Sequence, residues 1–173
     1  MKFLKKLFLF GLFLLSATAR SYAQQAISVD AGCTMNLKNS SSGINLSSFY
    51  HFTEHLSGGL EMNRFFEHHW LNKNEDITVS AWDFDLNFHY NFNLTGKLCV
   101  YPLAGISHTS EKEMEMNWTE PEYKRFFSFN TGAGIFLKLK RISPFAECMY
   151  TWGQLNQRFF LAGIGYEFEL KKK

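Results

Sequence analysis

The segment Trp82–Leu94, WDFDLNFHYNFNL, decides the fold class of this chain. Its even-numbered positions are all apolar or aromatic, and its odd-numbered positions are all polar. Side chains alternate between the two faces of a β-strand, so the segment predicts a strand with one apolar and one polar face. Its 13 residues exceed the usual strand of about 5–6 and suffice for a membrane-spanning strand, which needs roughly 9–11.

The same two-residue period recurs along the chain and predicts seven further strands. It is clear in four segments and weaker in three. The clear segments are Ile27–Leu37, Ile44–Phe52, Phe127–Leu139 and Phe160–Leu170, and the weaker ones are Gly58–Glu67, Leu98–Ser110 and Ile142–Trp152.

The connections between these strands favour an antiparallel up-and-down meander. Short links and longer polar links alternate along most of the chain, which would place both termini on the short-turn side. The short links are Thr53–Ser57, Leu94–Lys97 and Lys140–Ser143, with a last one at Gly153–Gln157, and the longer links are Lys38–Gly43, His68–Ile77 and Ser110–Lys124.

The N-terminal segment has the features of a cleaved secretory signal peptide. Three lysines lie within the first six residues, an apolar run follows at Leu7–Leu15, and small or polar residues lead up to Ala23. The run is shorter than the roughly 20 residues of a membrane-spanning helix, which favours export over anchoring. We therefore expect a signal peptide at residues 1–23 and one mature domain at residues 24–173.

Charge and cysteine content argue against several classes of protein. The expected signal peptide holds 4 of the 18 Lys and Arg residues and no acid, so the mature domain has 14 bases against 16 acids, a net charge of −2. This balance does not indicate a nucleic-acid partner. Cys33, Cys99 and Cys148 are far apart and odd in number, which is not typical of a disulfide scaffold. We expect neither a cofactor nor a bound metal.

Soluble and membrane barrels place the apolar face in opposite directions. A soluble barrel of the lipocalin type packs it inward, whereas a membrane barrel turns it toward lipid. The long strands, the 17% aromatic content and the export signal favour the membrane. We expect a closed antiparallel transmembrane β-barrel of about eight strands, because open sheet edges are not tolerated in hydrocarbon. A soluble exported ligand-binding barrel is one alternative.

The last predicted strand carries a motif that points to a family. In LAGIGYEFEL (Leu161–Leu170), Gly163, Tyr166 and Phe168 follow the order Gly-x-x-aromatic-x-aromatic. This order resembles the C-terminal strand signal of outer-membrane barrels that the barrel assembly machinery recognises. Two departures are Leu161, where that signal has a polar residue, and the three lysines that follow the strand.

Two further stretches support the same resemblance. YPLAGIS (Tyr101–Ser107) and FNTGAGIFLKL (Phe129–Leu139) are similar to strands of the small OmpA/OmpX-type outer-membrane β-barrel family. The resemblance implies an integral outer-membrane protein of a Gram-negative bacterium, with outer-membrane lipid and the barrel assembly machinery as partners.

Seven charged or imidazole side chains lie on the predicted polar face. An eight-stranded barrel is just wide enough for its own side chains, so we expect a polar, packed lumen in which these residues form a structural salt-bridge network and not a conduit. They are Asp30, His51, Asp83, Asp85, His89, Glu147 and Glu167.

His108 and Ser110 are weak candidates for catalysis. Their spacing puts both side chains on one face of a strand, and a carboxyl group of Glu111, Glu113 or Glu120 would be needed to orient the histidine. The pair resembles the His-x-Ser pair of outer-membrane lipid A deacylases, which implies a lipid A-modifying hydrolase as a second alternative. A polar strand end explains the same spacing, and we expect no catalysis.

Two predicted loops carry the remaining features. His68 and His69 lie beside Glu67, where a surface metal is imaginable, although loop histidines are usually solvated. The 110–124 loop contains EKEMEMNWTEPE (Glu111–Glu122), which is acidic and rich in methionine. Such a loop either folds onto the barrel rim or contacts a surface partner. The predicted function is therefore a structural or surface-interaction role in the outer membrane.

Overall fold

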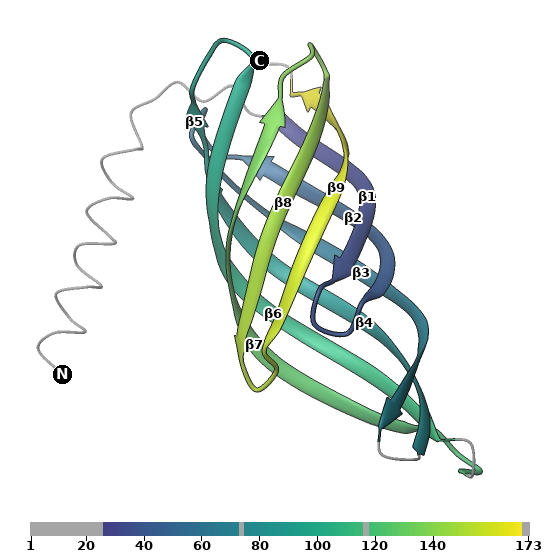
Figure 1. Cartoon of the computed structure of the whole chain (residues 1–173). Helices are drawn as coiled ribbons and strands as arrows, with labels where there is room; N and C mark the ends of the chain where they lie inside the picture. The colour runs from purple at the N-terminus through teal and green to yellow at the C-terminus, as the bar shows by residue number, and fades with distance from the viewer. Residues whose placement is uncertain (1–25, 73–74, 116–117, 171–173) are drawn as a thin grey trace, which may run out of the picture.

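The computed structural model describes residues 26–72, 75–115 and 118–170 of the chain (Figure 1). The predicted signal peptide at residues 1–23 lies outside these described residues. Among them, no helix is long and apolar enough to cross a membrane.

The described residues form nine strand segments that make an eight-stranded barrel. β4 and β5 are two parts of one barrel strand, because both pair with β6. The strand breaks at Asn91, whose backbone N–H donates to the carbonyl of His55 in the β2–β3 turn at 2.6 Å. The segments are β1 (Ala26–Asn36), β2 (Ser41–His51), β3 (Leu56–Asn72), β4 (Glu75–Tyr90), β5 (Phe92–Asn93), β6 (Leu98–Glu115), β7 (Glu122–Leu137), β8 (Ile142–Gly153) and β9 (Gln157–Glu169).

The sheet closes by pairing its first strand with its last. β1 and β9 are antiparallel in register from Ala26 opposite Glu169 to Asn36 opposite Phe159. Every other strand pairs with its neighbours in the chain, in the order of an up-and-down meander. Closure gives each backbone N–H and C=O group of the barrel wall a partner, as hydrocarbon requires. The predicted fold class is confirmed.

Two of the three long loops predicted from the sequence are wrong, because most of their residues continue the strands. β3 and β4 stay paired as far as Asn72 opposite Glu75, and β6 and β7 as far as Glu113 opposite Glu122. The alternation of apolar and polar residues fades there because neither face of these extensions meets lipid. The two hairpins project beyond the other strands at one end of the barrel (Figure 1).

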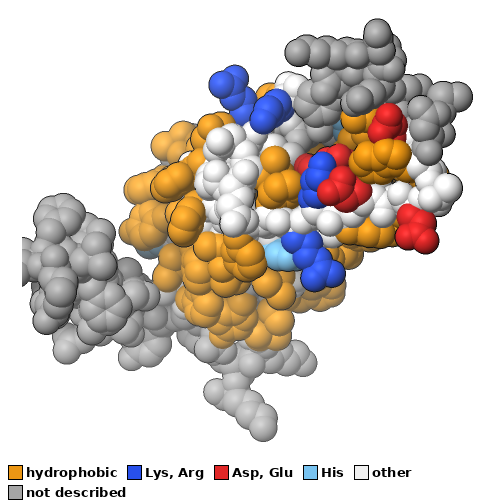
Figure 2. Space-filling model, turned by 90° about the horizontal axis from the view of Figure 1, so that it is seen from below, with side chains coloured by type: hydrophobic (Ala, Val, Ile, Leu, Met, Phe, Trp, Pro, Cys, Tyr) orange, Lys and Arg blue, Asp and Glu red, His pale blue; other side chains and the backbone are white. Residues whose placement is uncertain are grey.

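The apolar face of the strands points outward. On β4 the side chains of Trp82, Phe84, Leu86 and Phe88 are 38–49% exposed, whereas the intervening polar residues are buried. Hydrophobic side chains cover much of the outer wall (Figure 2). The soluble-barrel alternative is therefore wrong, because that barrel would turn these aromatic side chains inward.

A row of outward-facing residues marks the outer end of the membrane-spanning wall. Arg64, Trp82, Ser110 and Arg125 are paired side by side across β3, β4, β6 and β7. The Arg64 guanidinium lies 5.0 Å from the centre of the Trp82 ring. A basic and aromatic row of this kind is typical of the level of lipid headgroups. The described hairpin segments beyond this row, residues 66–72, 75–80, 111–115 and 118–124, are called the protruding sheet.

Candidate functional site

The lumen contains a chain of buried polar side chains, called here the polar network. Its members are linked by side-chain hydrogen bonds between amide and carboxyl groups on β2, β3, β4 and β7. Their order along the chain of bonds is Asn45, Asn63, Asp85, Asn130, Asn87 and Glu61.

Asp85 is the centre of the polar network. One of its carboxyl oxygens accepts from Asn63 Nδ2 at 3.1 Å, and the other accepts from Asn130 Nδ2 at 2.8 Å. Asn87 donates to Glu61 Oε1 at 2.6 Å. Buried carboxyl groups need such donors, because each unpaired polar group costs free energy in an interior. The alternation of β4 places Asp85 and Asn87 on the same inner face.

Asp83 forms a second, separate group nearer the outer end. It accepts from the hydroxyls of Ser107 at 2.6 Å and Thr109 at 2.7 Å. In the described part of the chain, no Lys or Arg side chain forms an ion pair with Asp83 or Asp85. At Asp83 and Asp85, amides and hydroxyls take the place of basic side chains as partners, whereas the salt-bridge network expected among the seven lumen residues stays a prediction.

An apolar cluster occupies the part of the lumen that faces β8 and β9. The sequence predicted a polar interior and missed this cluster, because its members are spread over several strands that carry polar inner residues as well. They are Phe65, Ala81, Tyr101, Leu103, Met149, Phe159 and Leu161, with Phe136 and Phe145 packed against them.

Stacked rings and complementary space hold the apolar cluster together. The rings of Phe65 and Phe159 stack with centres 5.3 Å apart. Tyr101 lies over Gly134, its partner on β7, where any Cβ would collide with the tyrosine ring. Leu161, the departure from the C-terminal strand signal, is 1% exposed within this cluster. Its apolar side chain is explained by packing.

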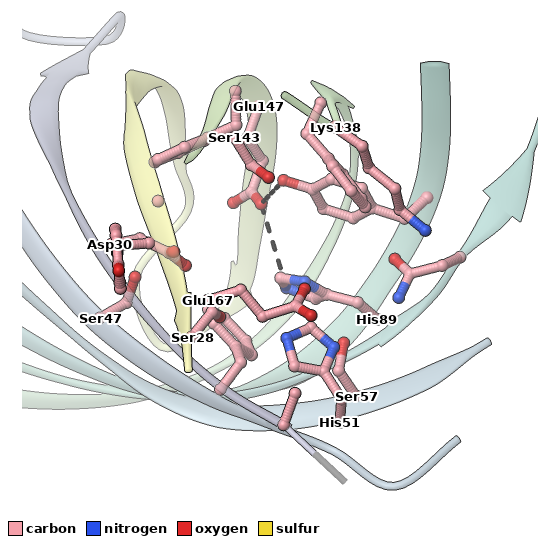
Figure 3. A pocket seen from close by; sticks show the side chains of 18 of the residues that line it. Ser28, Asp30, Ser47, His51, Ser57, His89, Lys138, Ser143, Glu147 and Glu167 are labelled. Carbon is pink, nitrogen blue, oxygen red and sulfur yellow. Dashed lines mark hydrogen bonds and ion pairs between the residues drawn. The ribbon is translucent and has the colours of Figure 1, made fainter. Parts of the chain in front are cut away.

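Five of the seven predicted lumen residues converge on one cavity at the end of the barrel that carries the termini. The cavity has a volume of about 210 Å³, and Figure 3 shows these side chains around it. Their spacing in the sequence assigned these residues to the inner face of their strands. Their position at the same end of the barrel follows from the tilt and pairing of the strands. They are Asp30, His51, His89, Glu147 and Glu167.

His89 lies at the inner end of this cavity. Its ring is held between Phe49, at 4.3 Å between ring centres, and Tyr101, at 4.5 Å. His89 Nε2 is 3.9 Å from Glu61 Oε1 and 4.0 Å from Glu147 Oε2, too far for a hydrogen bond. The Tyr101 hydroxyl donates to Glu147 Oε2 at 2.9 Å. The other oxygen of Glu147 has no hydrogen-bond partner.

At the opposite end of the lumen, the protruding sheet contacts β9. Gln157 Nε2 donates to Glu111 Oε1 at 3.2 Å, which links β9 to β6. Burial raises the pKa of Glu111, and the nearby charge of Glu113 raises it further. Lys124 donates to Glu113 Oε2 at 2.6 Å, and this hydrogen bond raises the pKa of the lysine.

The structure places His108 and Ser110 on a different face of β6 from Glu111 and Glu113, two of the three acids proposed to orient the histidine. His108 and Ser110 both lie on the outer face of β6, opposite Phe84 and Trp82 of β4. The alternation of β6 places Glu111 and Glu113 on the inner face, where they bond to Gln157 and Lys124. The His108 ring instead packs edge-on against Phe127, with ring centres 5.4 Å apart.

The histidines proposed as a metal site lie on strand β3, which a β-bulge between Phe65 and His68 distorts. Within the described residues, no group of three or more His, Cys, Asp or Glu side chains is arranged to hold a metal ion.

The three cysteines are free thiols. Of the assembly-signal residues, Tyr166 and Phe168 point outward and are 38% and 51% exposed.

Comparison with known proteins identifies a family and a fold. The family model described as outer membrane protein beta-barrel domain matches residues 8–168. Comparison with curated proteins finds no match in sequence. Among solved structures, Ail of Yersinia pestis is similar with a TM-score of 0.62 and 17% identity, over 84% of this chain and 99% of Ail.

Two Pseudomonas aeruginosa proteins are similar to a comparable degree. The N-terminal β-barrel domain of OprF has a TM-score of 0.60 and 16% identity, over 84% of this chain and 98% of that domain. OprG has a TM-score of 0.62 and 10% identity, over 87% of this chain and 99% of OprG. Ail is also solved in complex with the heparin analogue sucrose octasulfate. At these identities the likeness concerns the fold alone.

Proposed function

The chain belongs to the outer membrane protein β-barrel domain family, and on that premise we propose that it is a non-catalytic surface-interaction protein. As a member of this family it is an integral protein of the outer membrane, whose wall contacts lipid. The observation that carries the proposal is the protruding sheet, which has no role in spanning the membrane.

The protruding sheet offers unpaired backbone along two edges. β3 continues to Asn72, although its pairing with β2 ends where Phe65 meets Gly43. β7 begins at Glu122, although its pairing with β8 starts only at Ser128. Free edges of this kind can pair with a strand of another protein. A sheet that projects from the membrane and keeps two open edges is therefore suited to contact a partner.

The side chains of the protruding sheet combine apolar and acidic character. Tyr123 is 64% exposed, Phe66 49% and Met114 41%. Exposed Glu122 and half-buried Glu113 both lie near Lys124, which bonds to them at 3.7 Å and 2.6 Å. Large exposed apolar side chains rimmed by polar ones are typical of a protein-binding surface. The acidic residues do not favour a polyanion of the kind seen with Ail.

The interior supports a role without transport. The polar network and the apolar cluster lie side by side between the two ends of the lumen, and their largest members are almost completely buried. In an eight-stranded barrel, side chains packed in this way fill the interior between the two ends. Recognition of Gly163, Tyr166 and Phe168 by the assembly machinery stays a prediction, and a change at Phe168 would test it by its effect on insertion.

A cell-based experiment separates a surface role from a purely structural one. A strain without the protein is complemented with the full chain or with a shortened chain, in which Asn-Gly turns join Phe65 to Ala81 and Ser110 to Arg125. These residues are cross-strand partners, so a two-residue turn can link them. The readouts are vancomycin resistance, for the membrane barrier, and adhesion to matrix proteins and heparin.

A surface role predicts that the shortened chain restores the barrier but not adhesion to matrix proteins. The control replaces residues 38–40 of the β1–β2 turn with a Gly-Ser linker of equal length and keeps both functions. Normal adhesion by the shortened chain would refute the proposal. Adhesion to heparin alone would show that a polyanion is the ligand.

A further inference from the structure

The cavity at the end of the barrel that carries the termini has an excess of acidic groups. Its walls include Asp30, Glu61, Glu147 and Glu167, whereas Lys138 is the only Lys or Arg among the described residues that line it. The Lys138 ammonium lies at the mouth and donates to Asn93 Oδ1 at 3.2 Å. The acidic groups at the inner end therefore have no basic side chain among the described residues that line the cavity.

Two buried polar atoms in this cavity lack hydrogen bonds. Glu147 is 3% exposed, and its Oε1 has no partner. His89 is 8% exposed, and its Nε2 has no partner either. In Figure 3 the two side chains point toward one another across the cavity. A buried acceptor left without a donor costs about 1–3 kcal/mol, so a donor that enters the cavity would be stabilised there.

Aromatic rings line the space next to these atoms. Phe49 and Tyr101 hold the His89 ring between them, and Phe136 and Phe145 complete the wall. The faces of aromatic rings attract cations and also accept apolar groups. An apolar cavity of about 150 Å³ can hold a benzene molecule. The volume of about 210 Å³ here is therefore sufficient for an organic molecule about as large as benzene.

From these features we infer that the cavity binds a small organic cation: a protonated amine on a short apolar body. The ammonium group donates to Glu147 Oε1 and His89 Nε2, and the apolar body lies against the aromatic wall. The acidic lining disfavours an anion. A metal ion is disfavoured because no group of three ligating side chains is arranged for one in the described residues. This inference does not depend on the proposed surface role.

A titration of the refolded full barrel in detergent micelles tests the inference. The probe is n-butylamine, which is protonated at neutral pH, and n-butanol is its neutral counterpart. NMR signals of the His89 and Tyr101 rings report on the inner end of the cavity. We expect saturable shifts of both signals with n-butylamine, and at least tenfold weaker binding of n-butanol. Equal binding of the two probes, or no saturable shift, would overturn the inference.

Matched variants show whether the cation lies where the structure places it. Glu147→Gln replaces the carboxyl group with an amide that cannot ionise and should weaken n-butylamine binding about tenfold or more. Asp83→Asn is the control, because Asp83 is an equally buried acid of the lumen that does not line the cavity. Its affinity for the probe should not change. Equal losses in both variants would contradict the proposed position.

Two more variants address misfolding of Glu147→Gln and occupation of the cavity by the chain's own Lys138. Should Glu147→Gln fail to fold, as judged by loss of heat modifiability, Glu167→Gln at the less buried part of the cavity replaces it and is expected to weaken binding several-fold. Lys138→Gln tests whether the chain supplies its own cation. Unchanged or modestly stronger binding supports the inference, whereas binding only in Lys138→Gln would show that Lys138 is the occupant and would overturn it.

Discussion

The polar network and the apolar cluster fill the same lumen by different means. In the polar network, Asp85 and its neighbours are fixed by hydrogen bonds of defined direction. In the apolar cluster, Phe159 and its neighbours are fixed by shape and stacking. Hydrogen bonds in an interior are costly when one partner is lost, whereas apolar packing is costly when volume is lost. The difference predicts distinct responses to substitution in the two regions.

The largest effect is expected from a loss of volume in the apolar cluster. Phe159 is 1% exposed and stacks on Phe65. Phe159→Ala should destabilise the barrel by about 3–5 kcal/mol, because a cavity remains that its neighbours fill only in part. Equilibrium unfolding in urea, with the barrel in lipid vesicles, measures this change from the shift of the midpoint.

The neighbouring residue provides the control for this substitution. Phe160 is 41% exposed on the outer wall. Phe160→Ala removes the same atoms, but lipid chains fill the space, so only the transfer of the side chain contributes. A loss as large as that of Phe159→Ala would show that the apolar cluster adds no packing stability of its own.

A smaller effect is expected when an acceptor is removed from the polar network. Asp85→Ala leaves Asn63 Nδ2 without its acceptor, whereas Asn130 keeps its bond to Asn87. We expect a loss of about 1–3 kcal/mol, the cost of one unpaired buried donor. Asp85→Asn retains one acceptor oxygen and should lose less. The same unfolding measurement compares the two variants, and a larger loss in Asp85→Asn would contradict the assigned bonds.

The sequence predicts the outer wall of the barrel more completely than its lumen. The outer wall meets one uniform environment, lipid, so alternation such as that of Trp82–Leu94 is sufficient to predict the strands. Their length, the aromatic content and the export signal then indicate which face points outward. The lumen has no uniform environment. Leu161 and Met149 occupy inner positions, and their partners lie on strands distant in the sequence. No local period distinguishes such residues from the polar ones beside them.

The candidate cavity was predictable only as a list of residues. Asp30, His89 and Glu147 were assigned to the inner face by alternation, but their convergence depends on strand tilt and on the register between β1, β4 and β8. The protruding sheet was missed for a different reason. Glu111–Glu115 lies in strand β6 beyond the row at Ser110, where the strand stays paired with its neighbours although its outward-facing side chains no longer follow an apolar pattern.

The smallest effect concerns Glu111, whose bond to Gln157 links β6 of the protruding sheet to β9 of the barrel. Burial raises the pKa of Glu111 above its ordinary value of 4.5. The folded state therefore binds the proton more tightly than the unfolded state. Protonated Glu111 therefore contributes to the free energy of unfolding. This contribution is fully present below about pH 4.5 and is lost as the pH rises through the higher pKa of Glu111 in the folded state. The protruding sheet should thus open more readily at neutral than at acidic pH.

Hydrogen exchange of the backbone amides of β6 and β7 near Glu111 measures this opening between pH 4 and pH 7, after correction for the intrinsic pH dependence of exchange. Glu111→Gln cannot ionise, so its protection should stay constant over the same range. Tyr101 and its neighbours in the apolar cluster should keep their protection in both proteins, because local opening of a hairpin does not disrupt the closed wall. A pH-dependent loss that persists in Glu111→Gln would assign the effect to another acid of the protruding sheet, such as Glu113, and not to the link between β6 and β9.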